Sequence, residues 1–202
     1  MSLHGWAVFA AFWALFVTTP GPNAVNCIAN GMAHGLPRAL LGVLGILTQA
    51  SLFLALSALG ITALIAASPT LFAWAKLVGA GVLVWLGLRG WRNAAVAMAP
   101  ETGAGGIYGR AFLIATVNAK SVAGYLAAFS QFVEPDVSIG RQMWVIVPTA
   151  LTLTTLSYTT YTALGAWLGR LALGAVMSTR LRQGLALCFI LYGALLGLSA
   201  LA

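Results

Sequence analysis

The sequence predicts an all-α membrane protein with six transmembrane helices, arranged as two inverted three-helix repeats with both termini outside. Three observations predict it: an apolar composition, a one-sided distribution of arginines and one linker-like segment near the middle. Of the 202 residues, 61% are hydrophobic and only 6% are charged, and the mean hydropathy is +0.97. Soluble domains carry about 25% charged residues. The chain therefore cannot be a water-soluble monomer, and we expect one integral membrane domain over 1–202.

The apolar stretches have room for about six spanning helices of about 20 residues each. Hydropathy and polar breaks place these helices at about 6–29, 39–66, 71–89, 111–133, 144–168 and 184–202. A run of small and polar residues after Pro100 is the one linker-like segment. It divides the chain into a first repeat at about 1–97, a linker at about 98–110 and a second repeat at about 111–202.

The arginines predict the orientation. The odd-numbered connections and their flanks hold seven, against Arg141 alone in the even-numbered ones; the seven are Arg38, Arg89, Arg92, Arg110, Arg170, Arg180 and Arg182. Cytoplasmic connections are enriched in basic residues, so both termini are predicted outside. Because each half has an odd number of helices, the second half crosses in the opposite sense, as an inverted repeat requires. The basic residues form no patch, so the net charge of +7 indicates no nucleic-acid partner.

Lys120 is one of two lysines and lies well inside the fourth apolar stretch. Its position puts the ammonium near the middle of a bilayer about 30 Å thick, where an isolated charge costs about 3 kcal/mol or more. Lys120 is therefore a candidate functional residue, with a structural pair to a carbonyl as the alternative. The other lysine, Lys76, lies near a predicted helix end, where snorkelling explains it, and we leave it out of the site.

The first apolar stretch contains Thr18-Thr19-Pro20-Gly21-Pro22-Asn23, and we expect helix 1 to be broken at Pro20-Gly21-Pro22 because two prolines and a glycine prevent a continuous helix. A break at this depth is tolerated where the freed backbone groups are buried in protein or line a wet cavity. Pro22 suits the first position of a new helix, whose free N–H groups and positive dipole end suit a carboxylate. A simple kink is the alternative.

Further polar side chains could line a site in the membrane. The amides of Asn23, Asn26 and Asn30 share one helix face by their spacing. A stripe of hydroxyls at spacings of three and four follows in the fifth helix, where packing or back-bonding to the preceding turn is the alternative. The predicted substrate-binding residues are Pro20, Gly21, Pro22, Asn23, Asn26, Asn118, Lys120, Thr152, Thr155 and Tyr158.

Enzyme chemistry is not expected. The two histidines, three acids and two cysteines cannot be assembled into a metal cluster, a nucleophile with its base, or paired carboxylates in one cavity. We therefore predict no catalytic residue, no metal and no cofactor, and a metal-cation transporter is disfavoured for the same reason. A passive channel or facilitator for small polar solutes is the alternative to a transporter.

Two segments carry a family resemblance. Thr19-Pro20-Gly21-Pro22-Asn23 near the end of a first helix, followed by a series of glycines, resembles the signature of the lysine-exporter (LysE/RhtB) family of amino-acid efflux proteins. Asn118-Ala119-Lys120, followed by Gln131-Phe132-Val133, resembles the family's Asn-Pro-Lys segment and its downstream Gln-Phe-Val. Ala119 stands where the family has proline, which leaves open whether helix 4 is broken; a similar form occurs in the cysteine and O-acetylserine exporter branch.

The resemblance implies export of amino acids or related metabolites across the bacterial inner membrane, driven by the proton gradient. Residue chemistry narrows the substrate. A cationic side chain at midplane needs a nearby carboxylate, yet the three acids, at 101, 134 and 136, all lie in connections. We therefore expect a neutral zwitterion, with its carboxylate near Lys120 or the helix 1 break. Lys120 is also the embedded candidate for proton coupling, with Glu134 and Asp136 at the outer mouth and His34 at the inner mouth as secondary candidates.

Small-residue pairs predict close helix packing and permit a homodimer without requiring one. These pairs are Gly31/Gly35, Gly165/Gly169 and Gly193/Gly197.

Overall fold

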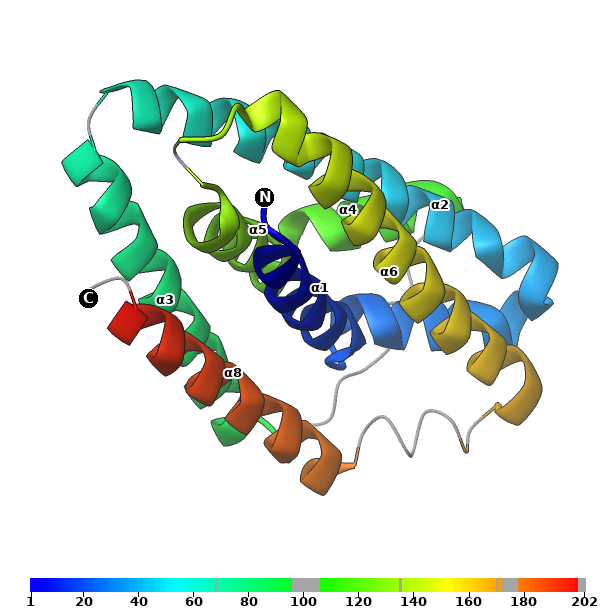
Figure 1. Ribbon diagram of the computed structural model, residues 1–202. Coiled ribbons are helices and arrows are strands. Elements are labelled where there is room, and N and C mark those ends of the chain that lie inside the picture. Colours follow the sequence, from blue (N-terminus) through cyan, green and yellow to red (C-terminus); the bar gives the residue numbers. More distant parts are fainter. Residues whose placement is uncertain (68, 96–105, 135, 170, 172–177, 200–202) are drawn as a thin grey trace.

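The computed structural model describes residues 1–67, 69–95, 106–134, 136–169, 171 and 178–199 (Figure 1). Within these ranges the chain is all-helical, which confirms the predicted class. The helices are α1 (Leu3–Thr18), α2 (Pro22–Ala67), α3 (Pro69–Arg92), α4 (Ile107–Val117), α5 (Ala119–Phe132), α6 (Ile139–Leu168) and α8 (Thr179–Ser199). Residues 98–105 of the predicted linker lie outside the described part, and α4 begins within the remainder of that linker.

Two of the predicted helices are each divided. The predicted break in helix 1 is confirmed, because α1 ends at Thr18 and α2 begins at Pro22. The predicted helix at about 111–133 is divided into α4 and α5 at Asn118, although no proline follows. The sequence therefore contains two helix breaks, one in each half.

The prediction placed a connection between residues 29 and 39, and the chain does turn there, but over one residue rather than a loop. Helix continues on both sides up to Gly35, which is non-helical with φ +69°. Glycine accepts a positive φ because it has no Cβ, and Pro37 falls in the first turn after Gly35, where no backbone donor is needed. The turn separates a first leg, residues 22–34, from a second leg, residues 36–67, and Figure 1 shows them meeting at one side of the molecule.

α1 lies in the middle of the bundle, with α5 and α6 beside it, and α3 and α8 pack together at one side (Figure 1). An aromatic cluster joins α1 to α5. The Trp13 ring lies 5.2 Å from that of Tyr125, and the Phe12 ring lies 5.3 Å from that of Phe132. These contacts hold the second half of α1 against the middle and end of α5. The two breaks lie close together, because Lys120 at the start of α5 contacts Thr19 at the end of α1.

Glycines mark the closest helix crossings. A Cβ at Gly165 of α6 would lie 2.8 Å from the Ile28 Cα, and one at Gly31 would overlap the backbone of α6. A Cβ at Gly193 of α8 would lie 2.9 Å from the Ala80 oxygen of α3. Close packing is thus confirmed for these three, and all three contacts are within the chain. Gly35 and Gly169 instead take positive φ at a turn and a helix end.

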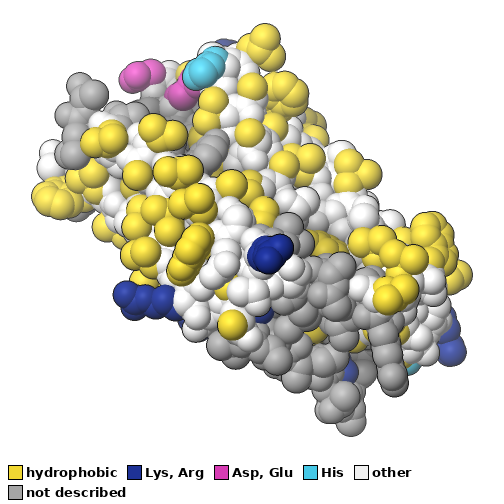
Figure 2. Space-filling view, turned by 90° about the horizontal axis from the view of Figure 1, so that it is seen from below, with side chains coloured by type: hydrophobic (Ala, Val, Ile, Leu, Met, Phe, Trp, Pro, Cys, Tyr) yellow, Lys and Arg dark blue, Asp and Glu magenta, His cyan; other side chains and the backbone are white. Residues whose placement is uncertain are grey.

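The surface is apolar while polar amides are buried, which is the reverse of a soluble protein. Trp144 is 84% exposed and Leu59 is 70% exposed, whereas Gln49 is 1% exposed. Figure 2 shows apolar side chains spread over one such face. In the described part of the chain, one helix, Pro22–Gly60, is long and apolar enough to cross a membrane; Leu3–Thr18, Ile107–Thr116 and Arg182–Leu195 are shorter apolar helices.

Candidate functional site

The first break leaves the carbonyl end of α1 open in the interior. Thr19 has an extended backbone, with φ −67° and ψ 122°, and α2 starts only at Pro22. The last carbonyls of a helix have no partner within it and carry the negative end of the helix dipole. These carbonyls therefore need donors from elsewhere in the fold.

Three side chains from α5 and α6 donate to the three carbonyls at this end. Ser157 Oγ donates to the Val17 oxygen at 3.0 Å, and the Tyr161 hydroxyl donates to the Thr18 oxygen at 2.5 Å. Lys120 Nζ donates to the Thr19 oxygen at 2.7 Å. Sequence analysis predicted only the lysine. Ser157 and Tyr161 could have been found by asking which polar side chains flank the predicted Tyr158.

Lys120 is partly buried and lies between an aromatic ring and the break. Its Nζ lies 5.0 Å from the centroid of the Phe16 ring, within the range of a cation–π contact. A Cβ placed on Gly21 would stand 3.7 Å from the Lys120 Cδ, so the stem of the lysine runs past this glycine. The structure therefore places Lys120 in contact with the break in helix 1. The contact that Lys120 makes here is a pair with a backbone carbonyl, which was the alternative to a functional role.

The second break depends on Asn118. Its backbone is extended, with φ −69° and ψ 106°, and its Oδ1 accepts a hydrogen bond from the Lys120 N–H at 3.1 Å. This is the side-chain N-cap of α5, which satisfies one of the free donors at the start of a helix. Asn118 thus acts on Lys120 by fixing the turn that carries it.

Three amides line the buried face of the first leg. Asn23, Asn26 and Asn30 are 3%, 4% and 7% exposed, and the Tyr158 hydroxyl lies close to Asn23. In each of the three, one amide atom has no partner: Asn23 Oδ1, Asn26 Nδ2 and Asn30 Nδ2. An unsatisfied buried polar group costs about 1–3 kcal/mol. Such a set indicates a place where water or a polar ligand is taken up.

Gln49 is a fourth buried amide, which sequence analysis missed. It lies on the second leg, is 1% exposed, and its Nε2 has no partner. The available signal was a glutamine in the middle of the second predicted helix, flanked by apolar turns on both sides.

The predicted hydroxyl stripe of α6 is turned away from the site in part. Thr152 is exposed, and Thr155 is partly buried with its hydroxyl donating to the Leu151 oxygen at 2.7 Å. The buried face of α6 carries Thr154, Ser157, Tyr158 and Thr162, of which Thr162 continues the spacing of the predicted stripe. Tyr158 is thus brought together with Asn23, whereas Thr152 is not brought to the break. Spacing alone defines a face but not which face points inward.

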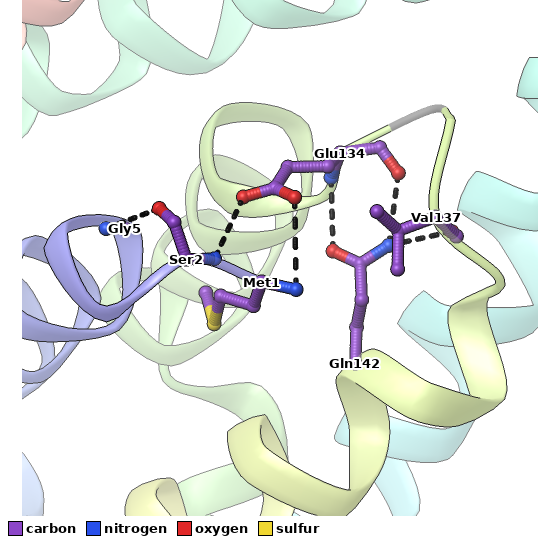
Figure 3. A network of polar contacts seen from close by, with 6 residues as sticks. All are labelled: Met1, Ser2, Gly5, Glu134, Val137 and Gln142. Carbon is purple, nitrogen blue, oxygen red and sulfur yellow. Dashed lines mark hydrogen bonds and ion pairs between the residues drawn. The ribbon is translucent and has the colours of Figure 1, made fainter.

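Glu134, one of the secondary candidates for coupling, lies at the far end of α5. Its carboxylate lies 3.6 Å from the Met1 amine and accepts from the Ser2 N–H at 3.3 Å. The side chain of Gln142 binds both the N–H and the carbonyl of Glu134, each at 2.9 Å (Figure 3). This network ties the start of α1 to the connection between α5 and α6.

Among the described residues, no group of three His, Cys, Asp or Glu side chains is placed to hold a metal ion. Lys76 lies in α3, but its side chain is outside the described part.

The comparison with protein families decides the class of the chain. The family described as LysE type translocator matches residues 14–200. The chain belongs to the LysE type translocator family. It is therefore a multi-pass membrane transport protein and not an enzyme.

Curated relatives of this translocator cover most of its length. An uncharacterized membrane protein of Vibrio cholerae is 32% identical over 187 residues, 91% of each chain. The homoserine/homoserine lactone efflux protein of Salmonella typhimurium is 26% identical over 200 residues, 97% of each chain. The leucine efflux protein of an Enterobacter species is 28% identical over 166 residues, 79% of this chain and 77% of the relative. No solved structure matches the chain.

Proposed function

We propose that this translocator exports neutral amino acids from the cytoplasm across the inner membrane by secondary active transport, with protons as the coupling ion. Two relatives that cover most of the chain are named for the efflux of homoserine and homoserine lactone and for the efflux of leucine, and both homoserine and leucine are neutral zwitterions. The site contributes independent support, because a partly buried ammonium lies at a broken helix and unpartnered amides line the helix that follows the break.

The contact between Lys120 and the Thr19 carbonyl carries the proposal. Among the side chains that the structure describes, the ammonium of Lys120 is the one lysine charge at the break, and Glu134 and Asp136 follow the far end of α5. A substrate carboxylate is a stronger partner for an ammonium than a neutral carbonyl, because both members of the pair are charged. Lys120 would therefore exchange the carbonyl for the carboxylate when substrate enters.

The same exchange provides a partner for the substrate's ammonium. Once Lys120 leaves it, the Thr19 carbonyl is a free acceptor at the negative end of α1. Asn23 Oδ1 is a second free acceptor on the next helix. A zwitterion thus satisfies both the lysine and the acceptors that the lysine vacates. A substrate with a further cationic side chain would need a carboxylate, and the described part of the bundle interior offers none.

Proton coupling is assigned to Lys120, as the titratable amine at the break. Glu134 is a weaker candidate because its carboxylate is already engaged by the Met1 amine and the Ser2 N–H. Export driven by an inward proton gradient requires that substrate and proton occupy the site in alternate steps, with the proton carried inward on the return step. Lys120 is the titratable side chain at which the two would alternate.

The proposed topology has six spans, two inverted repeats and both termini outside. Its support is the order of elements, since a divided helix, a long helix and a third helix occur in each half. On the face shown in Figure 2, the acidic side chains gather at one end and most of the basic side chains lie away from it. A homodimer stays a prediction, because the glycine contacts that suggested it are used within the chain.

The test is export from proteoliposomes with an imposed pH gradient. We expect saturable, gradient-driven flux of neutral amino acids such as threonine and leucine, little flux of lysine, and at least about tenfold slower flux for Lys120→Gln. Strong inhibition by lysine with none by neutral amino acids would overturn the substrate class. Non-saturable flux that ignores the gradient would favour a passive channel.

A further inference from the structure

Gln49 lies at the depth of the two helix breaks. Across the turn at Gly35, the two legs of α2 face each other where Asn30 Nδ2 lies 3.1 Å from the position of a Cβ on Gly42. Asn23 lies seven residues before Asn30, and Gln49 lies seven residues after Gly42. Seven residues are two helical turns, about 10 Å along the axis, and return to the same face. Asn23 and Gln49 are therefore at the same distance from this contact, each on its own leg.

Side-chain contacts on both sides of Gln49 agree with this position. One turn before it, Ile46 packs in a core cluster with Cys27 and Tyr158. One turn after it, the Phe53 ring lies 5.5 Å from the ring of Tyr125. Tyr125 in turn lies 6.3 Å from Phe16, the ring beneath the Lys120 ammonium. Gln49 is thus bracketed by residues that surround the site.

The chemistry of the free atom indicates what Gln49 takes. Its unpartnered atom is the nitrogen Nε2, a donor, in a side chain that is 1% exposed. Lys120, the Thr19 carbonyl and Asn23 account for the carboxylate and ammonium that all amino acids share. Gln49 lies on the second leg, and the part of the substrate that has no partner yet is its side chain. A buried donor favours a substrate oxygen and disfavours an aliphatic group that leaves it unpaired.

We propose that Gln49 is a specificity-determining residue that donates a hydrogen bond to an oxygen on the substrate's side chain. This translocator would then prefer neutral amino acids with a hydroxyl or amide oxygen over aliphatic ones of the same shape. The inference rests on the proposed function and adds to it the chemical class of the side chain.

The test compares isosteric pairs in proteoliposomes, threonine with valine and asparagine with leucine. Wild type should export the polar member with at least about fivefold higher kcat/KM, the factor that corresponds to one unpaired buried amide. Gln49→Met, of similar volume but without the donor, should bring both ratios close to one. Gln49→Asn keeps an amide and should retain part of the preference. Ser51→Ala, on the exposed side of the same helix, is the matched control and should leave the ratios unchanged.

Each outcome bears on a different claim. Equal export of both members by wild type would overturn the inference while leaving amino-acid export intact, and this result needs no variant to fold. A preference that survives in Gln49→Met would show that Gln49 does not meet the substrate. Absence of flux for every amino acid would instead refute the proposed function.

Discussion

The two helix breaks of this translocator are built in different ways. Between α1 and α2, three residues leave the helix, and Pro20 and Pro22 each lack a backbone donor. Between α4 and α5 only Asn118 leaves it, and Ala119, the next residue, is a strong helix former. The first break is therefore enforced by the backbone itself, whereas the second depends on one side chain that caps α5.

The breaks also play complementary parts. The first exposes carbonyls, and the second carries the lysine that donates to one of them. A change at the second break should therefore disturb the first, whereas the reverse effect should be weaker.

The largest effect is expected for Asn118→Ala. Loss of the cap costs about 1 kcal/mol and lets helix continue through residue 118, which would carry Lys120 away from the Thr19 carbonyl. Export should fall at least about tenfold in proteoliposomes. Asn118→Asp keeps an acceptor for the Lys120 N–H and should preserve the fold.

A double variant tests whether the break itself, rather than the Asn118 side chain, is needed for export. Adding Ala119→Pro to Asn118→Ala should recover much of the export, because proline disfavours the α conformation at the residue before it. If Asn118→Ala alone exports at the wild-type rate, the second break does not depend on its cap.

The next effect concerns the donors from α6. Ser157→Ala and Tyr161→Phe each leave one carbonyl of α1 without its donor, which should lower the free energy of unfolding by about 1–2 kcal/mol. Thermal unfolding in detergent measures it. Thr160→Val, an exposed residue whose hydroxyl bonds only to its own helix, is the control. Stability equal to the control in both variants would contradict the role of these donors.

A smaller effect is expected for Pro20→Ala. Gly21 and Pro22 still interrupt the helix, and the donors from α5 and α6 still hold the end of α1. Export should stay within about threefold of wild type, since one proline remains to break the helix. A loss as large as that of Asn118→Ala would reverse the comparison between the breaks.

The smallest effect is expected for Thr152→Val, because this side chain is exposed. Thr154→Val on the buried face should instead lower stability by about 1 kcal/mol, since Thr154 Oγ1 accepts from Trp13 Nε1 at 3.1 Å. Measuring export and unfolding for both variants tests which face of α6 points inward. Impaired export in Thr152→Val alone would support the predicted stripe instead.

The sequence predicted the parts of the fold that follow from local chemistry. Prolines marked the first break, and the asparagine spacing marked the polar face of the first leg. Lys120 was found because a charge deep in an apolar stretch is costly. The connection around Gly35 was predicted too long, because a single glycine with positive φ replaces a loop without changing hydropathy. The second break was left open because its cap is one hydrogen bond rather than a proline.

The site was predicted less completely, because its members meet only through packing. Which face of α6 points inward depends on the crossing at Gly165 and not on the spacing of threonines. Gln49 and Ser157 become part of the site because other helices fold over them. Neither position is defined by its own neighbours in the sequence.

The most direct test of the central claim is the binding of threonine and threoninamide to the purified protein, measured by titration calorimetry with wild type and Lys120→Gln. If Lys120 contacts the substrate carboxylate, wild type should bind threonine at least about tenfold more tightly than its amide, and Lys120→Gln should lose this preference. A preference for the carboxylate that is unchanged in Lys120→Gln would contradict the account.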